Sequence, residues 1–365
     1  MNTKIKLLII NSTLEKSGLT NVILNICKNI DYQKFDVNIL TLSIEPTSSL
    51  WSSFKKLPIK IESIGLNRIN WIFKGKTALI NKVNEINPDI IQTISYRGTV
   101  STIKYLNNYK IVSTLQADIH KNYTDTYGKI IGNYIANQEL NAFKNANSKI
   151  VCSNSLKQVY SSQIANINVV QNGIDNTIFH KIDSKQKTEL RTKLGYKNND
   201  TIFISVGALS NRKDPLTIIN AFKKSTIGKD SKLIFLGNGP LLNQCISASK
   251  GLNIEFIGNV DNTHEYYKIA DAFISASSSE GLPNSVLEAG MCGLFCYLSN
   301  IPQHTEIFEE VKTQAVFFNY GDVNELAKQI DNYKTTSKSE KSIDFNALKM
   351  AKQYEEIYLN IYKNT

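Results

Sequence analysis

Short apolar segments alternate with segments of helical pattern along most of this 365-residue chain. In the first half, apolar runs that predict buried strands occur at residues 5–10, 35–42, 57–64, 111–115 and 149–153, and a further strand is expected to begin at 88–91 and to end within 92–98. Between them, apolar residues at helical spacing predict helices, most clearly at 20–30, 76–86 and 130–144. Strands and helices that alternate in this way are typical of a parallel sheet covered on both faces, so we expect an α/β protein.

A second series of strands is expected at residues 202–206, 232–236, 254–257, 272–274 and 315–318. The turn-forming pair Asn172 and Gly173 separates the two series. The apolar spacing of residues 343–362 is helical again, but no strand follows it, so this helix could pack back on the first domain. We therefore expect one domain at 1–170, joined by a C-terminal helix at 343–365, and a second at 171–342.

The formal charge of +10, with a pI near 9.1, limits the classes of partner. Anionic membranes, phosphorylated substrates and nucleic acids all attract basic proteins. The lysines and arginines are spread along the chain rather than gathered in a block, so we expect no nucleic-acid partner. We place Arg68, Trp71, Phe73, Lys74 and Lys76 in a loop, which could lie at a membrane interface or be ordinary solvated surface.

The compartment is indicated by the apolar runs and the cysteines. No run approaches the ~20 apolar residues that a transmembrane helix needs, and the apolar core near the start is too short for a signal peptide. The five cysteines are odd in number and scattered, as expected for reduced thiols. We expect a cytoplasmic protein, which could also lie on an anionic inner membrane surface.

The segment 276–293 carries the clearest chemistry, because it places Glu280 and Glu288 eight positions apart across a turn and a helix start. Gly281, Pro283 and Asn284 form the turn, with Pro283 in the first helical turn, where proline is tolerated. A carboxylate beside free helix N–H groups suits a nucleotide. The carboxylate can accept hydrogen bonds from the ribose hydroxyls, and the N–H groups can donate to phosphate. Alternatively, Glu288 caps its own helix, or its negative charge interacts favourably with the positive end of the helix dipole.

Two more loops of the second domain should converge on this segment, since parallel strands end at one edge of their sheet. The loop at 207–213 brings Arg212 and Lys213 beside a helix N-terminus, a favourable place for a diphosphate. The loop at 237–240 brings Gly237 and Gly239, which allow close backbone approach. Together the three loops predict a pocket for a nucleoside diphosphate.

The same residues resemble a known family. The matching segments are SVGALSNRKDPLTIINAF, LIFLGNGPL, FIGNV, YYKIADAFISASSSEGLPNSVLEAGMCG and IPQHTEI, together with QNGID and the N-terminal SGLTNVILNI. In this order they resemble retaining glycosyltransferase family 4, densely from about residue 172 to 306 and more thinly in the first half. The resemblance implies the GT-B fold, with two Rossmann-like domains facing across a cleft and a C-terminal helix that crosses back to the first domain.

The resemblance also implies roles. Glu288 would bind the ribose, Glu280 would lie near the transferred sugar, and Lys213 would hold the diphosphate. With the loop argument, the donor-nucleotide residues are Gly207, Arg212, Lys213, Gly237, Asn238, Gly239, Gly281, Leu282, Pro283, Asn284 and Glu288. The expected phosphate or acceptor residues of the first domain are Gly18, Leu19, Tyr96, Arg97 and Gln116.

The chain departs from the family pattern at two functional positions. Ala208 stands where the family often has arginine, and Arg212 could supply the missing charge. Gln116 stands where the family commonly has histidine, and His120 could take over that catalytic role. The resemblance favours front-face attack, in which the leaving diphosphate takes the acceptor proton. A covalent route would instead need a carboxylate nucleophile, for which Glu280 is the obvious candidate.

These observations predict transfer of a sugar from a nucleotide sugar, with UDP as the expected nucleotide, to a glycan or a lipid-diphosphate-linked acceptor in bacterial surface polysaccharide synthesis. No two aspartates are separated by one residue, so the Asp-x-Asp metal motif is absent, and we expect neither a metal nor another cofactor. A nucleotide-dependent oxidoreductase would need Gly-x-Gly-x-x-Gly after the first strand, where only Gly18 is present. A GT-B sugar-nucleotide epimerase and a catalytically silent partner subunit remain as alternatives.

Overall fold

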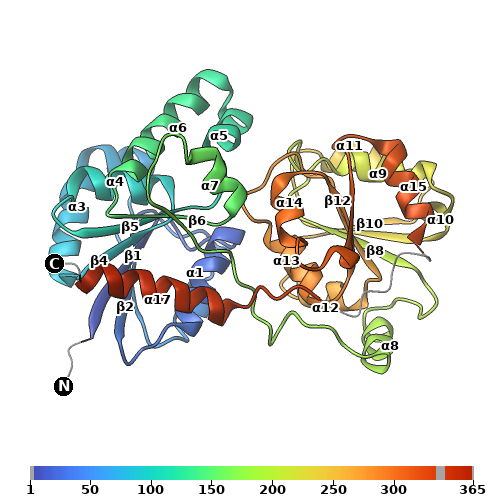
Figure 1. Cartoon of the computed structure of the whole chain (residues 1–365), viewed down its shortest axis with the longest axis horizontal. Coiled ribbons are helices and arrows are strands. Elements are labelled where there is room, and N and C mark those ends of the chain that lie inside the picture. The colour runs from blue at the N-terminus through green and yellow to red at the C-terminus, as the bar shows by residue number, and fades with distance from the viewer. Residues whose placement is uncertain (1–3, 334–341, 364–365) are drawn as a thin grey trace. The chain divides into compact units, whose positions relative to one another are not determined.

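The computed structural model describes residues 4–333 and 342–363, and the chain divides into two compact units (Figure 1). The first unit comprises Met1–Gly173 and Asn346–Thr365, and the second comprises Ile174–Phe345. Parts of the domain ranges expected from the sequence, at 1–3, 334–341 and 364–365, lie outside the described residues. Within the described helices, no segment combines the length and apolar character needed to cross a membrane.

The first unit is built on a seven-stranded sheet in the order β3-β2-β1-β4-β5-β6-β7, in which every pairing is parallel. Its central strands are apolar on both faces; Leu7 of β1, for instance, lies opposite Val37 and Ile90. The strands are β1 (Ile5–Asn11), β2 (Phe35–Thr41), β3 (Lys60–Ser63), β4 (Ile90–Thr93), β5 (Lys110–Leu115), β6 (Ser148–Val151) and β7 (Ile167–Val169).

The helices of this unit are α1 (Gly18–Asn29), α2 (Trp51–Phe54), α3 (Arg68–Ile86), α4 (Tyr96–Tyr105), α5 (Ile119–Tyr127), α6 (Lys129–Lys144), α7 (Asn154–Tyr160) and α17 (Ala347–Lys363). The chain runs in one direction across the sheet from β1 to β3 and in the other from β3 to β6. Because parallel crossovers are right-handed, α3, α4 and α6 cover one face and α1 covers the other.

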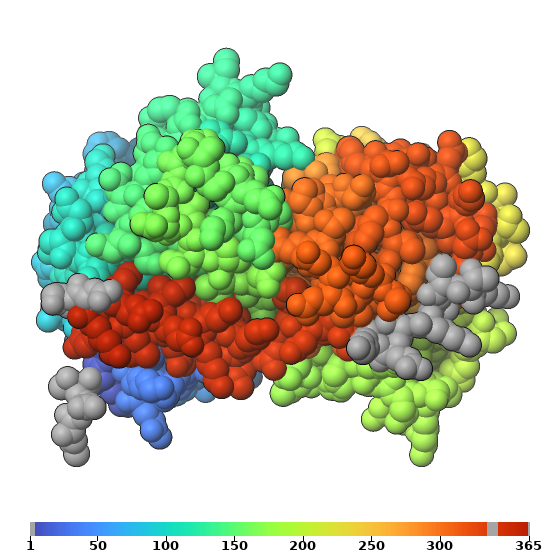
Figure 2. Space-filling model, in the orientation of Figure 1, coloured from blue at the N-terminus to red at the C-terminus, as the bar shows by residue number. Residues whose placement is uncertain are grey.

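The C-terminal helix α17 packs beside α1, as the red helix along the first unit in Figures 1 and 2 shows. Its Tyr354 and Tyr358 are fully buried, and the Tyr358 hydroxyl donates to Gln92 of β4 at 3.2 Å. Glu355 accepts the backbone N–H of Asp31 at 2.7 Å. The predicted return of this helix to the first domain is therefore confirmed.

The sequence prediction was wrong for the start of α3. Residues 68–75 are helical rather than a loop, and Asn67 caps the helix by accepting the N–H of Asn70 at 2.8 Å. In the first two turns Ile69, Ile72 and Phe73 are exposed and Trp71 is partly buried, although Ile72 stands seven and eleven positions before the buried Leu79 and Val83, on the same side of the helix.

The second unit has a six-stranded parallel sheet in the order β10-β9-β8-β11-β12-β13. Its strands are β8 (Ile202–Val206), β9 (Lys232–Leu236), β10 (Ile254–Gly258), β11 (Ala272–Ser275), β12 (Phe295–Ser299) and β13 (Ala315–Phe318). Its helices are α8 (Ser184–Lys193), α9 (Pro215–Lys224), α10 (Thr226–Asp230), α11 (Leu242–Ala248), α12 (Thr263–Ile269), α13 (Asn284–Met291), α14 (Pro302–Ile307), η1 (Lys312–Gln314) and α15 (Val323–Asp331). Two parallel sheets with helical layers confirm the expected α/β class.

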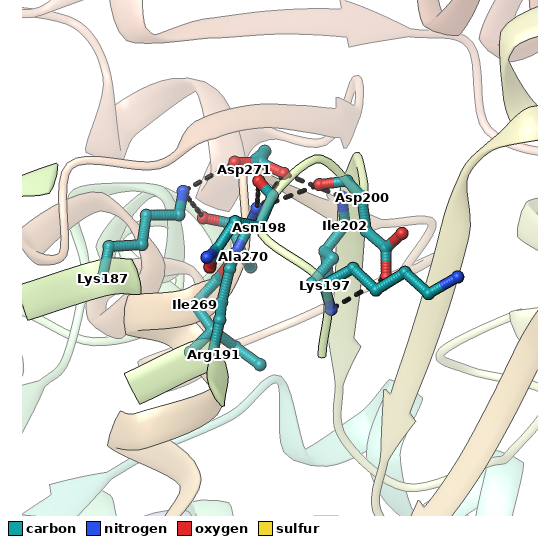
Figure 3. A network of polar contacts seen from close by, with 9 residues as sticks. All are labelled: Lys187, Arg191, Lys197, Asn198, Asp200, Ile202, Ile269, Ala270 and Asp271. Carbon is teal, nitrogen blue, oxygen red and sulfur yellow. Dashed lines mark hydrogen bonds and ion pairs between the residues drawn. The ribbon is translucent and has the colours of Figure 1, made fainter. Parts of the chain in front are cut away.

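Helix α8 contacts the second sheet through hydrogen bonds and ion pairs rather than through an apolar face (Figure 3). Arg191 is 4% exposed and donates to Asp271 at 2.7 Å and to the carbonyl of Ile269 at 3.0 Å and 2.8 Å. Lys187 donates to the other oxygen of Asp271 at 2.6 Å. Asp271 also accepts the N–H of Ile202 at 2.8 Å, so one carboxylate joins α8 to the start of β8.

Candidate active site

The loops after β8 and β9 lie in backbone contact at the carboxyl edge of the second sheet. A Cβ atom at Gly237, whose φ is +127°, would lie 2.1 Å from the carbonyl oxygen of Gly207. A Cβ atom at Gly239 would lie 2.4 Å from the carbonyl oxygen of Leu209, whose N–H donates to the carbonyl of Asn238 at 3.1 Å. Only glycine allows this approach, so the two loops pack backbone against backbone.

A carboxylate with two cations lies where the loop after β8 meets the segment after β11. The ammonium of Lys213 is 2.6 Å from Glu280 Oε1, and the guanidinium of Arg212 is 2.7 Å from Glu280 Oε2. Arg212 also donates to the carbonyl of Ser279 at 2.8 Å, and the N–H of Ser278 donates to the carbonyl of Arg212 at 2.8 Å. The structure therefore joins Glu280, Arg212 and Lys213 into one cluster with one excess positive charge.

Glu280 is held in its ionised form by these neighbours. Its side chain is 8% exposed, and this burial alone would raise its pKa. The positive charges of Lys213 and Arg212 outweigh burial and lower the pKa of Glu280 from 4.5 to about 2. At neutral pH the cluster consequently presents a fixed carboxylate and two fixed cations, which suit the hydroxyls of a sugar and the oxygens of a diphosphate.

Glu288 lies in the second turn of α13 and is half-buried. Burial raises the pKa of Glu288 from 4.5 to about 7, although the Tyr267 hydroxyl and the charge of Lys213 act to lower it. The residue before the helix is Pro283, rather than a first-turn residue as predicted. Gly281 and Leu282 are buried ahead of it, and Asn284 is the first helical residue.

Loop residues and a proline line a small hollow beside the cluster. Its walls include Gly207, Ala208, Leu209, Lys213 and Pro215. Ala208 is exposed here, and Arg212, which is expected to supply the charge missing at that position, pairs with Glu280.

His304 is a buried residue near the cluster that the sequence analysis did not single out. It is 0% exposed, and its Nδ1 lies 2.9 Å from the carbonyl oxygen of Ser299, so Nδ1 carries the proton and Nε2 is an acceptor. Within residues 4–333 and 342–363, Nε2 has no hydrogen-bond partner. Burial lowers the pKa of His304 to about 4, and the charges of Glu280 and Lys213 both reach the ring. The histidine stands in IPQHTEI, but the strand before it, β12 at Phe295–Ser299, was not predicted, so its position at a strand end was not apparent from the sequence.

The predicted residues of the first unit follow β1, β4 and β5, which are neighbours in the sheet. Gly18 opens α1 after the N-cap Ser17, and Leu19 packs against the first core. Gln116 follows β5 with its side-chain nitrogen buried and without a partner in the described part of the chain. His120 Nδ1 lies 3.3 Å from Asn133 Oδ1.

Tyr96 and Arg97 begin α4 but reach in different directions. The Tyr96 hydroxyl donates to Gln138 of α6 at 2.6 Å. Arg97 donates to the hydroxyl of Ser43, after β2, at 2.6 Å and lies over the ring of Trp71 at 5.5 Å. Across the described ranges 4–333 and 342–363, no three or more His, Cys, Asp and Glu side chains come together in a group that could hold a metal ion.

Both halves of the chain match family models. Residues 16–177 match the model described as Glycosyltransferase Family 4, and residues 186–350 match the model described as Glycosyl transferases group 1.

Curated relatives match over shorter stretches. N-acetyl-alpha-D-glucosaminyl L-malate synthase of Bacillus anthracis is 26% identical over 54% of this chain and 55% of its own length. Alpha-monoglucosyldiacylglycerol synthase of Streptococcus pneumoniae is 28% identical over 53% and 46%. UDP-Gal:alpha-D-GlcNAc-diphosphoundecaprenol alpha-1,3-galactosyltransferase of Escherichia coli is 31% identical over 40% and 39%. The chain thus spans about half, or less, of the length of these relatives.

Solved structures match over nearly the whole chain. Anabaena Alr3699/HepE in complex with UDP and glucose has a TM-score of 0.79 and 16% identity, with 98% of this chain and 100% of that one covered. TarM has a TM-score of 0.74 and 12% identity, with 100% and 99% covered. At such low identity these likenesses concern the fold alone, and the fold is GT-B.

Proposed function

Because the chain belongs to the glycosyltransferase family that these two models describe, we propose that it transfers a sugar from a nucleoside diphosphate sugar to a glycan or lipid-linked acceptor in bacterial surface polysaccharide synthesis. The observation that carries this proposal is the cluster of Glu280 with Arg212 and Lys213 beside the glycine loops. It offers a carboxylate for sugar hydroxyls and cations for a diphosphate, beside loops whose glycines allow close backbone approach.

The proposed donor is a UDP-sugar. Support comes from the relative named for a UDP-Gal donor and from the HepE structure, which holds UDP. In this chain Glu288 would accept the ribose hydroxyls, and Lys213 and Arg212 would contact the diphosphate. In the structure both cations are bound to Glu280, so a bound diphosphate would share them with that carboxylate.

We propose that transfer retains the anomeric configuration by front-face attack. The bond from the anomeric carbon to the diphosphate oxygen breaks, and the acceptor hydroxyl oxygen bonds to the same face of that carbon. The acceptor proton passes to the departing diphosphate oxygen, whose negative charge Lys213 and Arg212 stabilise. This route is favoured over a covalent one because two ion pairs and a pKa of about 2 make Glu280 a weak nucleophile.

Metal independence is part of the same proposal, since Lys213 and Arg212 would stabilise the negative charge of the leaving diphosphate in place of a divalent ion. The measurement is transfer rate with and without EDTA. Equal rates would support the proposal, and a loss that Mg²⁺ or Mn²⁺ restores would contradict it.

The test of the donor site is thermal stabilisation by UDP, GDP and ADP, with Glu288→Ala beside the wild type. We expect UDP to raise Tm in the wild type and in the control Glu309→Ala, whose side chain is exposed, but not in Glu288→Ala. Labelled UDP-sugar then separates the activities. Transfer to extracted lipid or glycan supports the proposal, epimerised donor indicates a sugar-nucleotide epimerase, and binding alone indicates the silent subunit that Ala208 and Gln116 favour.

A lipid-linked acceptor would bring the protein to the inner face of the cell membrane. The relative named for diphosphoundecaprenol and the one named for a glucosyldiacylglycerol support this part of the proposal. The basic charge of the chain, +10, favours an anionic membrane surface.

A further inference from the structure

Large apolar side chains are exposed on two helical segments of the first unit. Of the thirteen exposed large hydrophobic residues in the described chain, seven lie on α3 and on the α5–α6 hairpin. They are Ile69, Ile72, Phe73, Tyr127, Ile130, Ile131 and Tyr134. Phe73 is 80% exposed and Ile130 is 88% exposed, which is unusual for side chains of this size in water.

The two segments belong to one layer of helices. Helices α3 and α6 both contact α4, and the crossover direction places all three on the same face of the first sheet. Figure 2 shows the α5–α6 hairpin, in teal to green, projecting at the top of the first unit. The exposed apolar residues therefore occur on the outer helical layer of a single face.

The exposed residues of α3 form a stripe. Ile69, Ile72 and Phe73 are spaced three and four positions apart, and Lys76 continues the stripe one turn later. Leu79 and Val83 lie seven and eleven positions after Ile72, on the same side of the helix, so this side is exposed in the first two turns and buried in the core beyond them. Exposed apolar side chains next to basic ones in the first turns of a helix suit a membrane interface.

The cations around this stripe are close to one another. Arg68 is near enough to Arg97 to lower the pKa of Arg97, after the larger effect of burial. Lys76 of α3 and Lys104 of α4 lie 5.8 Å and 5.4 Å from the centre of the same ring, that of Tyr105. Among residues 4–333 and 342–363, none of these four cations is within 4.0 Å of a carboxylate. Like charges gathered without a carboxylate favour an anionic partner.

We propose that α3, α4 and the α5–α6 hairpin form a docking surface for a bilayer rich in anionic phospholipid. Ile72, Phe73 and Ile130 would enter the boundary between headgroups and acyl chains, while the arginines and lysines of α3 and α4 contact lipid phosphates. The purpose of this docking rests on the proposed function, because it brings the protein to a lipid-linked acceptor. Docking itself requires neither donor nor transfer.

The experiment is co-sedimentation of the full chain with vesicles of phosphatidylcholine alone or of phosphatidylcholine with phosphatidylglycerol, at low salt. The wild type should bind only the anionic vesicles. Ile72→Ser/Phe73→Ser should weaken binding at least tenfold, since burying apolar surface supplies part of the affinity. Arg68→Gln/Lys76→Gln should weaken it by about 25-fold, at about fivefold for each cation near an anionic surface.

Matched controls lie on the second unit. Ile246→Ser and Lys250→Gln, which change exposed residues there, should bind vesicles as the wild type does. Absence of wild-type binding, equal binding to phosphatidylcholine alone, or equal losses in controls and test variants would overturn the proposal. A wild-type dimer that Ile72→Ser/Phe73→Ser dissolves, without vesicle binding, would assign the surface to a second copy instead and also overturn it. UDP stabilisation in every variant shows whether the protein is folded and tests the donor site independently of docking.

Discussion

Replacing Lys213 with methionine should remove the stronger of the two positive charges that lower the pKa of Glu280. Methionine keeps the length of the aliphatic chain that lies against Gly207, where Lys213 Cε would be 3.2 Å from an added Cβ, but removes the charge 2.6 Å from Glu280. The lowering of the Glu280 pKa from 4.5 to about 2 corresponds to about 3 kcal/mol of stability, and Lys213 is the first of the charges that produce it. Because the folded-state pKa is depressed, this stability is present above pH 4.5 and is lost as the pH falls through about 2.

The assay is a double-mutant cycle of Lys213→Met and Glu280→Gln, with the free energy of unfolding measured in urea at pH 7 and near pH 2. We expect a coupling energy of about 2 kcal/mol at pH 7, since Arg212 still pairs with Glu280 in the single variant, and a much smaller one near pH 2. A coupling below about 0.5 kcal/mol at pH 7, typical of exposed pairs, would refute the reasoning. So would a coupling that does not change with pH. In the transfer assay the same Lys213→Met variant should lose about 10²-fold or more in kcat.

Three further predictions concern the second unit. Asp271→Asn should lower the free energy of unfolding by about 3–5 kcal/mol in urea, because it leaves a buried guanidinium unpaired, whereas the exposed Asp230→Asn should cost little. The affinity for UDP should rise between pH 6 and 8 as Glu288, with a pKa of about 7, ionises to accept the ribose hydroxyls; calorimetry showing the same rise in Glu288→Gln would contradict this role. Gly237→Ala should lower the free energy of unfolding by more than about 2 kcal/mol, because its Cβ would overlap a carbonyl oxygen. Gly251→Ala, at positive φ but in open space, should lower it by about 1 kcal/mol. Similar Tm values for the two variants would contradict the close approach at Gly237.

Much of the fold could be predicted because most central strands are apolar on both faces. The runs at 202–206 and 232–236 became β8 and β9 with the predicted limits. The start of α3 was placed in a loop, although Ile72 stands seven and eleven positions before Leu79 and Val83, on the same side of the helix. Apolar spacing predicts the helix, but it does not tell which of its turns are buried and which are exposed.

The sequence predicts that the loops of the candidate site meet, but it does not predict which side chains pair with one another there. The order of parallel strands predicts that the segments of Lys213 and Glu280 meet at one sheet edge. That both Arg212 and Lys213 pair with one carboxylate depends on rotamers and burial, which spacing does not determine. His304 was missed for a similar reason, because only the structure shows that its Nδ1 is used by Ser299 and that the ring is fully buried.

The placement of α17 in the first unit affects how the chain can fold during synthesis. Met350, Tyr354 and Tyr358 complete a core whose other members, such as Phe35, come from the first 173 residues, and the whole second unit is translated between the two groups. The first unit therefore cannot close its core until residues 350–358 have left the ribosome, whereas the continuous second unit can fold as soon as residue 345 emerges. A nascent chain stalled before residue 346 should expose that incomplete core to chaperones, although the first 173 residues and the whole second unit have already been made.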